Sequence, residues 1–489
     1  MSDAIAFGTD GWRAVIADSF TFDNVRRVSD AIAVAARTLQ PPDGIDRNAL
    51  VVGFDRRFLS REFAAVVAES LRGAGFRVLL SDRATPSQTI SFTARHRRLL
   101  GGVVVTASHN PAKYNGLKFK AWYGGSALPE MYAAIASSLG QRDARAGGAV
   151  AEENILDDYV SALRGQLDLE LLRNANLAIL HDPIHGAAAT IPSKVLGIDY
   201  VGSHRITRET AEPRDRATAI DAIRGDTNPS FGGVNPEPIP ENLGASQNVM
   251  LTGAYDLAIC NDGDADRVGI LDERGAFVSP QKAIALLALY LVREKKREGE
   301  IVKTFSTTRL IERVARSLGA TLHETPIGFK YVADLMLARN VLIGGEESGG
   351  IGFGHFMPER DGILSGLLVA EAVAHYGLPL SDIIARMEKE FGALHYDRRD
   401  VHRPMPQCAQ LIERVRGGEL DAAFGVPFAS REEKDGVKMN FADGSWILFR
   451  KSGTEPLIRI YCESPDAERV QSMLDKAVEE LDRPLSSRA

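Results

Sequence analysis

The chain has 489 residues, of which 44% are hydrophobic and 25% are charged, a composition that excludes fibrous and wholly disordered proteins. Its 65 acidic and 58 basic residues leave a net charge of −7, the wrong sign for a protein that binds the phosphate backbone of nucleic acid. At about 150 residues per domain, the length predicts three or four domains.

Neither a membrane-spanning segment nor a disulfide framework is expected. The longest clean apolar run, residues 283–292, is about half the ~20 residues that a spanning helix needs, and residues 1–11 lack the order of a signal peptide. We therefore expect a cytoplasmic protein without a membrane partner. Cys260, Cys408 and Cys462 are far apart and in no CxxC spacing, which predicts small core residues.

Three apolar runs end in an aspartate and a polar turn, at residues 49–57, 176–186 and 256–267. Each is typical of a buried strand. Neighbouring segments have helical periodicity, such as residues 63–76, where two glycines give a stop signal. The recurrence predicts three architecturally related α/β domains.

The domain boundaries follow from changes in composition. The small polar stretch 141–154 predicts a linker, and the Pro- and Gly-rich stretch 224–242 predicts an ordered loop. Beyond residue 391, strand-like runs and a closing helical pattern predict a smaller C-terminal α+β domain. The predicted domains are residues 1–148, 149–255, 256–390 and 391–489.

The first stretch whose residues could take part in catalysis is residues 101–111, where an apolar strand leads into the sequence TASHNP. Pro111 biases Asn110 towards extended geometry and prevents the strand from running on into a helix. We therefore expect Ser108 to be presented to solvent by a reactive loop. The alternative is an ordinary turn in which Ser108, His109 and Asn110 only satisfy backbone groups.

The second stretch carries Asp262, Asp264 and Asp266 directly after an apolar strand. Alternate side chains of extended backbone share a face, so the three carboxylates would repel one another unless a hard cation lay between them. The pattern predicts a Mg²⁺ site. A calcium EF-hand is excluded, because Arg267 stands where that loop needs glycine and a strand precedes it. The alternative is a solvated acidic turn.

The third stretch is the sequence GGEESGG, residues 344–350, again after an apolar strand. Glycines on both sides allow the backbone to approach a ligand closely. Glu346 and Ser348 can accept hydrogen bonds from, and donate them to, neighbouring hydroxyls of a sugar. A flexible surface turn would have the same composition, so this stretch alone leaves both interpretations open.

The fourth stretch, RKSGTEP, follows the strand SWILF. Arg450 can form paired charge-assisted hydrogen bonds to phosphate oxygens, and Ser452 and Thr454 add hydroxyl donors beside the exposed amides around Gly453. We predict a phosphate-binding loop. The chain has neither a Walker loop nor a GxGxxG fingerprint after a strand, which disfavours a nucleotide enzyme.

Together TASHNP, DGDADR, GEESGG and RKSGTEP, in this order and at domain-sized intervals, resemble the α-D-phosphohexomutase family, the phosphoglucomutases and phosphomannomutases. The opening sequence FGTDGWR, residues 7–13, is also similar to the N-terminal signature of that family. The resemblance therefore spans nearly the whole chain. It implies three related α/β domains with mixed sheets and a smaller C-terminal α+β domain around a central cleft, which receives one motif from each.

The resemblance also implies a phosphoryl-transfer mechanism. Ser108 would carry the transferable phosphoryl group, and Mg²⁺ would be bound by its phosphate together with Asp262, Asp264 and Asp266. The cation would offset the charge of the phosphate during in-line attack by a sugar oxygen. Phosphoserine would convert a hexose 1-phosphate or 6-phosphate to a bound 1,6-bisphosphate that turns around, so glucose 1,6-bisphosphate is the expected activator.

Further roles are implied residue by residue. Three cationic or polar groups would stabilise the transferring charge, namely Arg13, His109 and Arg267. Lys118 would be the general base, which requires a lowered pKa. The substrate would be bound by Glu346, Ser348 and Lys330 and, at its non-transferring phosphate, by Arg450, Ser452, Gly453 and Thr454.

The preferred sugar is harder to predict. GEESGG with GFKY is most similar to glucose-preferring members, because Glu347 and Gly350 depart from the GEMSGH of mannose or dual-specificity members and the GEQSGH of glucosamine members. Phosphoglucomutase is the first hypothesis, followed by a phosphomannomutase or dual enzyme and then by a phosphoglucosamine mutase. A non-catalytic phosphosugar sensor and a phosphatase are the alternatives of another kind, and the oligomeric state stays open.

Overall fold

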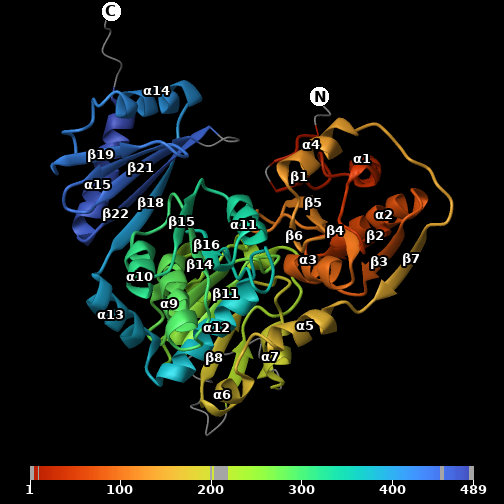
Figure 1. Cartoon of the computed structure of the whole chain (residues 1–489), viewed down its shortest axis with the longest axis horizontal. Helices are drawn as coiled ribbons and strands as arrows, with labels where there is room; N and C mark the ends of the chain where they lie inside the picture. Colours follow the sequence, from red (N-terminus) through yellow and green to blue (C-terminus); the bar gives the residue numbers. More distant parts are fainter. Residues whose placement is uncertain (1–4, 9, 199–200, 203–217, 452–455, 484–489) are drawn as a thin grey trace, which may run out of the picture.

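The computed structural model describes residues 5–8, 10–198, 201–202, 218–451 and 456–483. These residues form four β-sheets, and helices pack around each of them. Figure 1 shows the N-terminal unit in red and orange at one side, the C-terminal unit in blue at the other, and the two middle units in yellow and green between them. Four units in chain order agree with the predicted architecture.

The first unit has a mixed sheet of seven strands. Its strands are β1 (Trp12–Val15), β2 (Asp46–Phe54), β3 (Arg77–Ser81), β4 (Leu99–Val105), β5 (Tyr114–Ala121), β6 (Gly125–Ser126) and β7 (Ala149–Glu153). Its helices are α1 (Phe22–Thr38), α2 (Ser60–Gly73), α3 (Ser87–His96) and α4 (Pro129–Ser137). The strand order is β1-β5-β4-β2-β3-β7, with β6 on β5.

The local sequence explains two central elements of this unit. Every residue of β4 is buried, as its apolar run predicts for a central strand. The α1 helix starts where the Thr21 side chain accepts a hydrogen bond from the amide of Asn24, and it has an acidic first turn and a basic last turn. At the sheet edge, β7 pairs in parallel with β3, so the predicted linker 141–154 contains a strand and the sheet extends past residue 148.

The second unit has a mixed sheet of six strands in the order β13-β12-β11-β8-β10-β9. They are β8 (Ala178–Asp182), β9 (Val201–Gly202), β10 (Ala219–Ala222), β11 (Leu257–Asn261), β12 (Val268–Asp272) and β13 (Phe277–Val278). The helices are α5 (Leu156–Arg164), α6 (Leu169–Asn174), α7 (Ile191–Leu196) and α8 (Gly244–Met250), with two 3₁₀ turns, η1 (Phe231–Gly233) and η2 (Pro240–Asn242), in the predicted ordered loop.

The boundary between the second and third units differs from the prediction. β11 pairs in parallel with β8, and β12 and β13 continue the same sheet. The predicted boundary at residues 255/256 therefore runs through the middle of a hydrogen-bonded sheet. The hydrogen bonding places the boundary after β13 instead, because a strand cannot be separated from the neighbours that satisfy its backbone groups.

The third unit has a four-stranded sheet in the order β15-β14-β16-β17. Its strands are β14 (Glu300–Thr304), β15 (Leu322–Thr325), β16 (Val341–Gly345) and β17 (Ile351–Gly352). Its helices are α9 (Pro280–Arg293), α10 (Leu310–Leu318), α11 (Phe329–Ala338), α12 (Gly362–Tyr376) and α13 (Leu380–Phe391).

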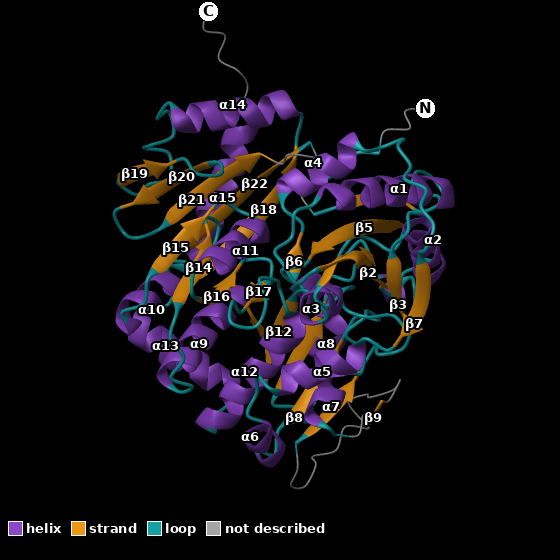
Figure 2. Ribbon diagram, turned by 45° about the vertical axis from the view of Figure 1, so that its right-hand side comes forward, coloured by secondary structure: helices purple, strands orange, loops and turns teal. Residues whose placement is uncertain are grey.

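The fourth unit is a five-stranded antiparallel sheet with two helices, as the C-terminal α+β prediction requires. Its strands are β18 (His395–His402), β19 (Phe428–Glu432), β20 (Val437–Phe441), β21 (Trp446–Lys451) and β22 (Leu457–Ser464). Its helices are α14 (Met405–Arg416) and α15 (Ala467–Asp482). Figure 2 shows α14 along the upper side of this sheet.

The apolar cores do not follow the four sheets one to one. The first and fourth units each have a core of their own, whereas one continuous core joins the second and third units, with Leu163 of α5, Leu287 of α9 and Leu367 of α12 among its members. The second and third units are thus packed as one body. All three cysteines are buried and free, as predicted.

Membrane-spanning potential is weak in the described part of the chain. None of its helices alone has the length and apolar composition to cross a bilayer, and only the bent pair α12 and α13 meets that criterion when taken together.

Candidate active site

The loop after β4 presents Ser108 in an unusual conformation. Ser108 has a φ of 52°, in the left-handed region that side chains other than glycine rarely adopt. Its amide donates to the hydroxyl of Thr106 at 2.9 Å. Contrary to the expectation of a serine presented to solvent, Ser108 is buried, with 1% of its surface exposed.

Arg57 stabilises this loop through hydrogen bonds to its backbone. Its guanidinium donates to the carbonyl oxygens of Ser108 at 2.5 Å and Asn110 at 2.6 Å, and its Nε pairs with Asp55 at 3.1 Å. Both side chains of this ion pair are fully buried. The sequence indicated that Asp55 ends a strand, but it gave no sign that Arg57 would organise the Ser108 loop.

The three aspartates after β11 converge, though not by the predicted route. Each of Asp262, Asp264 and Asp266 offers a carboxylate oxygen, and these oxygens lie within 4.8 Å of one another. The backbone between them is a turn in which Ala265 has a φ of 64°, rather than an extended strand. The turn, and not the alternation of an extended chain, brings the carboxylates together.

Hydrogen bonds from α3 of the first unit fix the position of this acidic turn. At the start of α3, the Ser87 hydroxyl donates to Asp264 at 2.6 Å, and the Ser87 amide donates to the Asp264 carbonyl at 3.1 Å. Next to it, the Gln88 side-chain amide donates to the carbonyl of Ala265 at 2.9 Å. The sequence did not point to either residue, because nothing local distinguishes them from ordinary helix-start residues.

Ser108 and the acidic turn meet directly. The Ser108 hydroxyl donates to Oδ2 of Asp262 at 2.9 Å. Oδ1 of Asp264 and Oδ1 of Asp266 are buried and have no hydrogen-bond partner in the described part of the chain. Buried carboxylate oxygens without donors, in a cluster of three acids, suit a hard divalent cation such as Mg²⁺. The residues present therefore fit the predicted metal.

The electrostatics of the turn agree with this fit. Burial and repulsion from Asp266 and Asp264 raise the pKa of Asp262 well above its ordinary value. Burial also opposes ionisation of Asp264, but the Lys118 ammonium and the Ser87 hydroxyl outweigh burial and lower its pKa. Asp262 therefore resists ionisation beside two other acids, and a bound cation would remove that penalty.

Lys118 lies at the same place but is not set up as a free base. Its Nζ is 3.0 Å from Asp264, 3.1 Å from Asp10 and 3.7 Å from Asp266. Burial alone would lower the pKa of Lys118, yet the three carboxylates raise it above the ordinary value. The expected lowered pKa is therefore absent from this arrangement. Asp10, in the opening FGTDGWR, is a site residue that the sequence analysis missed.

Of the three predicted charge-stabilising residues, His109 contacts Ser108, and Arg13 and Arg267 contact residues next to it. Nδ1 of His109 is 3.4 Å from the Ser108 hydroxyl, and burial with the nearby arginines lowers the pKa of His109. Arg13 donates to the Asn110 side chain at 2.5 Å. Arg267 donates through its amide to Asp262 at 3.0 Å, while its guanidinium pairs with Glu237 at 2.8 Å.

Arg360 connects the acidic turn to the predicted sugar-binding loop. Its guanidinium lies 2.6 Å from Asp266, 3.5 Å from Asp10 and 3.5 Å from Glu346. Burial raises the pKa of Glu346 to about 7, although Arg360 opposes that rise. Next along the loop, Glu347 accepts a hydrogen bond from Ser306 at 2.7 Å. Sequence analysis did not single out Arg360, which sits in the ordinary polar sequence PERDG.

Of the remaining predicted residues, Ser348 lies in the same loop as Glu346, Lys330 lies in α11 and Arg450 in β21. Ser348 is half-buried in the loop after β16, and the ammonium of Lys330 lies 4.8 Å from the ring centre of Tyr331. Arg450 pairs with Asp435 at 3.0 Å in the fourth unit. Ser452, Gly453 and Thr454 lie outside the described residues, so their predicted contacts with phosphate stay predictions.

Family models match all four units of the chain. The models for phosphoglucomutase/phosphomannomutase alpha/beta/alpha domains I, II and III match residues 4–146, 157–275 and 279–391, and the model for the C-terminal domain matches residues 408–480. The chain belongs to this family, the α-D-phosphohexomutases. The change from domain II to domain III after residue 275 agrees with the boundary that the second sheet requires.

Relatives in the family differ in the sugar that their names specify. A phosphoglucomutase/phosphomannomutase of Thermococcus kodakarensis is 29% identical over 98% of this chain and 99% of its own length. A phosphoglucosamine mutase of Cereibacter sphaeroides is 30% identical over 97% of each chain. A solved protein of Thermus thermophilus, which carries the name phosphomannomutase, has a TM-score of 0.83 and 35% identity, covering 99% of this chain and 100% of its own.

Proposed function

We propose that this protein interconverts hexose 1-phosphates and hexose 6-phosphates through a phosphoserine at Ser108, with Mg²⁺ as cofactor and glucose as the preferred sugar. Membership of the phosphohexomutase family supports mutase chemistry. The observation that carries the proposal is the contact between the Ser108 hydroxyl and Asp262, at 2.9 Å, beside two further buried carboxylates.

Asp262, Asp264 and Asp266 would hold Mg²⁺ together with the phosphate on Ser108. The bound cation would offset the negative charge of the phosphoryl group, which otherwise repels an incoming oxygen. The protein holds Ser108 and the three carboxylates in position relative to one another. Arg57 and the left-handed backbone fix Ser108, and α3 fixes the acidic turn, so the reacting groups need little rearrangement.

In the first transfer, the bond between phosphorus and the Ser108 oxygen breaks as a bond forms between phosphorus and a free hydroxyl of the sugar phosphate. In our proposal Lys118 takes the hydroxyl proton, and the Ser108 oxygen takes up a proton as it leaves, which restores the serine hydroxyl. Because Asp10 and Asp264 hold Lys118 as an ammonium, this role requires that those contacts loosen and that Lys118 gives up its own proton before the transfer. Arg13, Arg267 and His109 would stabilise the charge on the transferring group.

The substrate would be held at two ends. Glu346 and Ser348 would bind the ring hydroxyls. The phosphate that is not transferred would be bound by Arg450, Ser452, Gly453 and Thr454, and Lys330 would also contact the substrate. Reversal of the bound glucose 1,6-bisphosphate between two transfers would then complete the isomerisation.

The proposed glucose preference rests on the sequence of the loop after β16. Glu347 follows Glu346 there, as in glucose-preferring members that the sequence resembles. A phosphomannomutase or dual enzyme is the second candidate, on the likeness to the Thermus thermophilus protein, which is 35% identical. A phosphoglucosamine mutase is the third, because a relative of that name is 30% identical over nearly the whole chain.

The test is an assay of product identity with purified full-length protein. Glucose 1-phosphate with Mg²⁺ and catalytic glucose 1,6-bisphosphate should give glucose 6-phosphate, and Ser108→Ala should abolish the conversion. Ser137→Ala, an exposed serine of α4, is the matched control and should keep full activity. Free phosphate as the main product would indicate a phosphatase, and substrate binding without turnover would indicate a sensor.

Comparing kcat/KM for the phosphates of glucose, mannose and glucosamine would then rank the three sugars. A ratio in favour of glucosamine 6-phosphate would overturn the glucose preference but not the mutase chemistry. The cytoplasmic location predicted from the sequence belongs to the same proposal, and cell fractionation tests it.

A further inference from the structure

Asp361 joins three units of the chain at one buried point. Its carboxylate accepts hydrogen bonds from the Leu364 amide at 2.9 Å in the third unit, from the Tyr159 hydroxyl at 2.7 Å in the second, and from the Gln88 side-chain amide at 3.4 Å in the first. Asp361 is 1% exposed, and Gln88 and Tyr159 are fully buried. Figure 2 shows α3, which carries Gln88, above α5, which carries Tyr159.

The Gln88 side chain connects Asp361 to the acidic turn. Its Nε2 also donates at 2.9 Å to the carbonyl oxygen of Ala265, the residue between Asp264 and Asp266. A side-chain amide nitrogen has two protons, so it can serve both acceptors. Oε1 of Gln88 is buried and has no hydrogen-bond partner in the part of the chain that the structure describes. The two acceptors therefore decide that the nitrogen of Gln88, and not its oxygen, faces Ala265.

A second connection runs through the start of α12. Asp361 is the N-cap of this helix, because its side chain accepts from the Leu364 amide. The amide of Gly362, the first residue of the helix, donates to the same Ala265 carbonyl at 3.2 Å. A Cβ atom at Gly362 would overlap the carbonyl group of Arg267. The capped end of α12 is thus packed directly against the acidic turn.

Ala265 is the point at which the turn needs support. Its φ of 64° lies in the left-handed region, which is unfavourable for a residue with a side chain and persists only when the surroundings hold it. The hydrogen bonds from Gln88 and Gly362 meet at its carbonyl oxygen. Because Asp264 and Asp266 flank Ala265, its backbone conformation sets how their carboxylates lie relative to each other.

We propose that Asp361 is a positioning residue of the metal site. By orienting Gln88 and capping α12, it holds the Ala265 carbonyl and with it the carboxylates of Asp264 and Asp266. This inference rests on the proposed Mg²⁺ site and deepens it, because the affinity for Mg²⁺ then depends on how the first three units pack together. Partners that orient metal ligands commonly affect affinity in this way.

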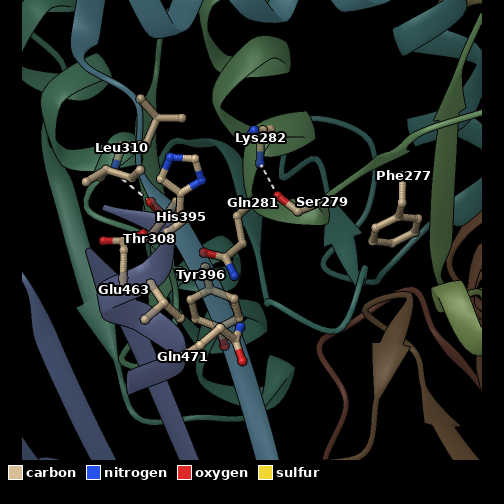
Figure 3. Close-up of a pocket in the computed structure, with 13 residues that line it drawn as sticks. Phe277, Ser279, Gln281, Lys282, Thr308, Leu310, His395, Tyr396, Glu463 and Gln471 are labelled. Atoms are coloured by element: carbon tan, nitrogen blue, oxygen red, sulfur yellow. Dashed lines mark hydrogen bonds between the residues drawn. The ribbon is translucent and has the colours of Figure 1, made fainter. Parts of the chain in front are cut away.

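The competing explanation is that Asp361 only caps α12. A cap without a positioning role changes the stability of the protein but not the affinity of the folded protein for Mg²⁺. Ser279 supplies the comparison, since it caps α9, a helix of similar length, by accepting from the Lys282 amide at 3.4 Å (Figure 3). Within the described part of the chain, no hydrogen bond links Ser279 to the acidic turn. Ser279→Ala therefore removes a helix cap without touching the site.

The experiment is calorimetric titration of the full-length protein with Mg²⁺ at pH 8. Burial raises the pKa of Asp361 to about 6, so its carboxylate is ionised at this pH. Asp361→Ala should weaken Mg²⁺ binding about ten- to a hundredfold. Ser279→Ala should leave the affinity unchanged, although it also loses a cap. Equal affinities of Asp361→Ala and the parent protein would overturn the proposal.

Two further variants separate positioning from charge. Asp361→Asn removes the negative charge but keeps an oxygen for Gln88 and Leu364 and a nitrogen that can donate to Tyr159. It should restore most of the affinity that Asp361→Ala loses, and an affinity as low as that of Asp361→Ala would assign the effect to charge and overturn the proposal. Gln88→Leu keeps the cap of α12 but removes the donor to Ala265, and should weaken Mg²⁺ binding about tenfold.

Should Asp361→Ala fail to fold, as judged by its thermal melt, Gln88→Leu and Tyr159→Phe decide the question. Tyr159→Phe removes one donor to Asp361 and should weaken Mg²⁺ binding about two- to tenfold. Parental affinity in both variants would overturn the proposal while leaving the metal site intact. Failure of the parent protein itself to bind Mg²⁺ would instead refute the proposed metal site and this inference with it, so the two failures are distinguishable.

Discussion

Two strand ends in this molecule look alike in sequence and differ in what their aspartates do. Asp55 follows β2 and Asp262 follows β11, and both are buried. Asp55 accepts four hydrogen bonds, two from Arg57 and one each from Ser60 and Thr106. Its carboxylate is thus completely partnered by the protein.

At the end of β11, around Asp262, the carboxylates are not all paired. Two of the three carboxylates that meet there keep an oxygen without any donor among the described residues. Whether every carboxylate oxygen has a donor therefore distinguishes a carboxylate that supports the fold from a group of carboxylates that can bind a ligand. A single buried acid whose oxygens are all paired stabilises the fold, whereas a cluster of buried acids, such as Asp262 with Asp264 and Asp266, that together keep unpaired oxygens forms a site.

The strongest test of this contrast removes charge from the site. Asp262→Asn should lower kcat/KM about a thousandfold or more, because charge stabilisation by the metal is worth several kcal/mol. It should change the stability of the Mg²⁺-free protein by only about 1 kcal/mol, since relief of repulsion from Asp264 and Asp266 compensates for the weakened polar contacts. Steady-state kinetics and urea denaturation measure the two effects, and a large loss of stability would contradict the contrast.

The matching change at the structural end should have the opposite profile. Asp55→Asn leaves the buried Arg57 guanidinium without its carboxylate, which should cost about 3–5 kcal/mol of folding free energy. Urea denaturation monitored by circular dichroism measures this loss. Asp18→Asn, at an exposed position, is the control and should be neutral. A variant as stable as the parent protein would show that the Asp55–Arg57 pair does not support the fold.

Magnesium binding should distinguish the two ends without reference to activity. At about a hundred times its dissociation constant, Mg²⁺ should raise the free energy of unfolding by about 2.7 kcal/mol, because it binds only the folded state. Asp262→Asn should lose this increment, whereas Asp55→Asn should keep it on its lower baseline. Thermal melts with Mg²⁺ and with a chelator measure the increment, and its survival in Asp262→Asn would argue against a metal at the acidic turn.

The smallest expected effect is a pH dependence of stability caused by His181, which precedes Asp182 at the end of β8. Burial lowers the pKa of His181 from 6.5 to about 4, so the unfolded chain binds a proton more readily than the folded protein between these values. The contribution of His181 to stability is complete above pH 6.5 and is lost as the pH falls towards 4. Near pH 5.5 the loss should be about 1.4 kcal/mol. Urea denaturation at several pH values should show this slope in the parent protein and a shallower slope in His181→Gln.

Sequence patterns predicted the parts of the site that are contiguous in the chain. The strand before Ser108, the three aspartates and the glycine-flanked Glu346 all stand out because apolar runs end at polar, turn-forming residues. The residues that orient them were not predicted. Arg57, Ser87 and Arg360 act on loops far away in sequence, and nothing in their own neighbourhoods signals that role.

The sheet boundaries show the same limit. The aspartate-ending strand β11 resembles the start of a new domain, yet its backbone hydrogen bonds join it to β8, a strand that lies far earlier in the chain. Hydrophobic periodicity identifies a strand but not its neighbour, because pairing partners are chosen by the packing of whole layers.

By itself, the sequence determined the α/β class, the succession of four units, the family resemblance and the residue types of the site, because these depend on local periodicity and on short contiguous motifs. Only the tertiary structure decided which carboxylates are fully partnered, how Ser108 is buried in a left-handed backbone, and that Lys118 stands among three acids. The physical reason is that hydrogen bonding, burial and charge balance are properties of neighbours in space, and most of these neighbours are distant along the chain.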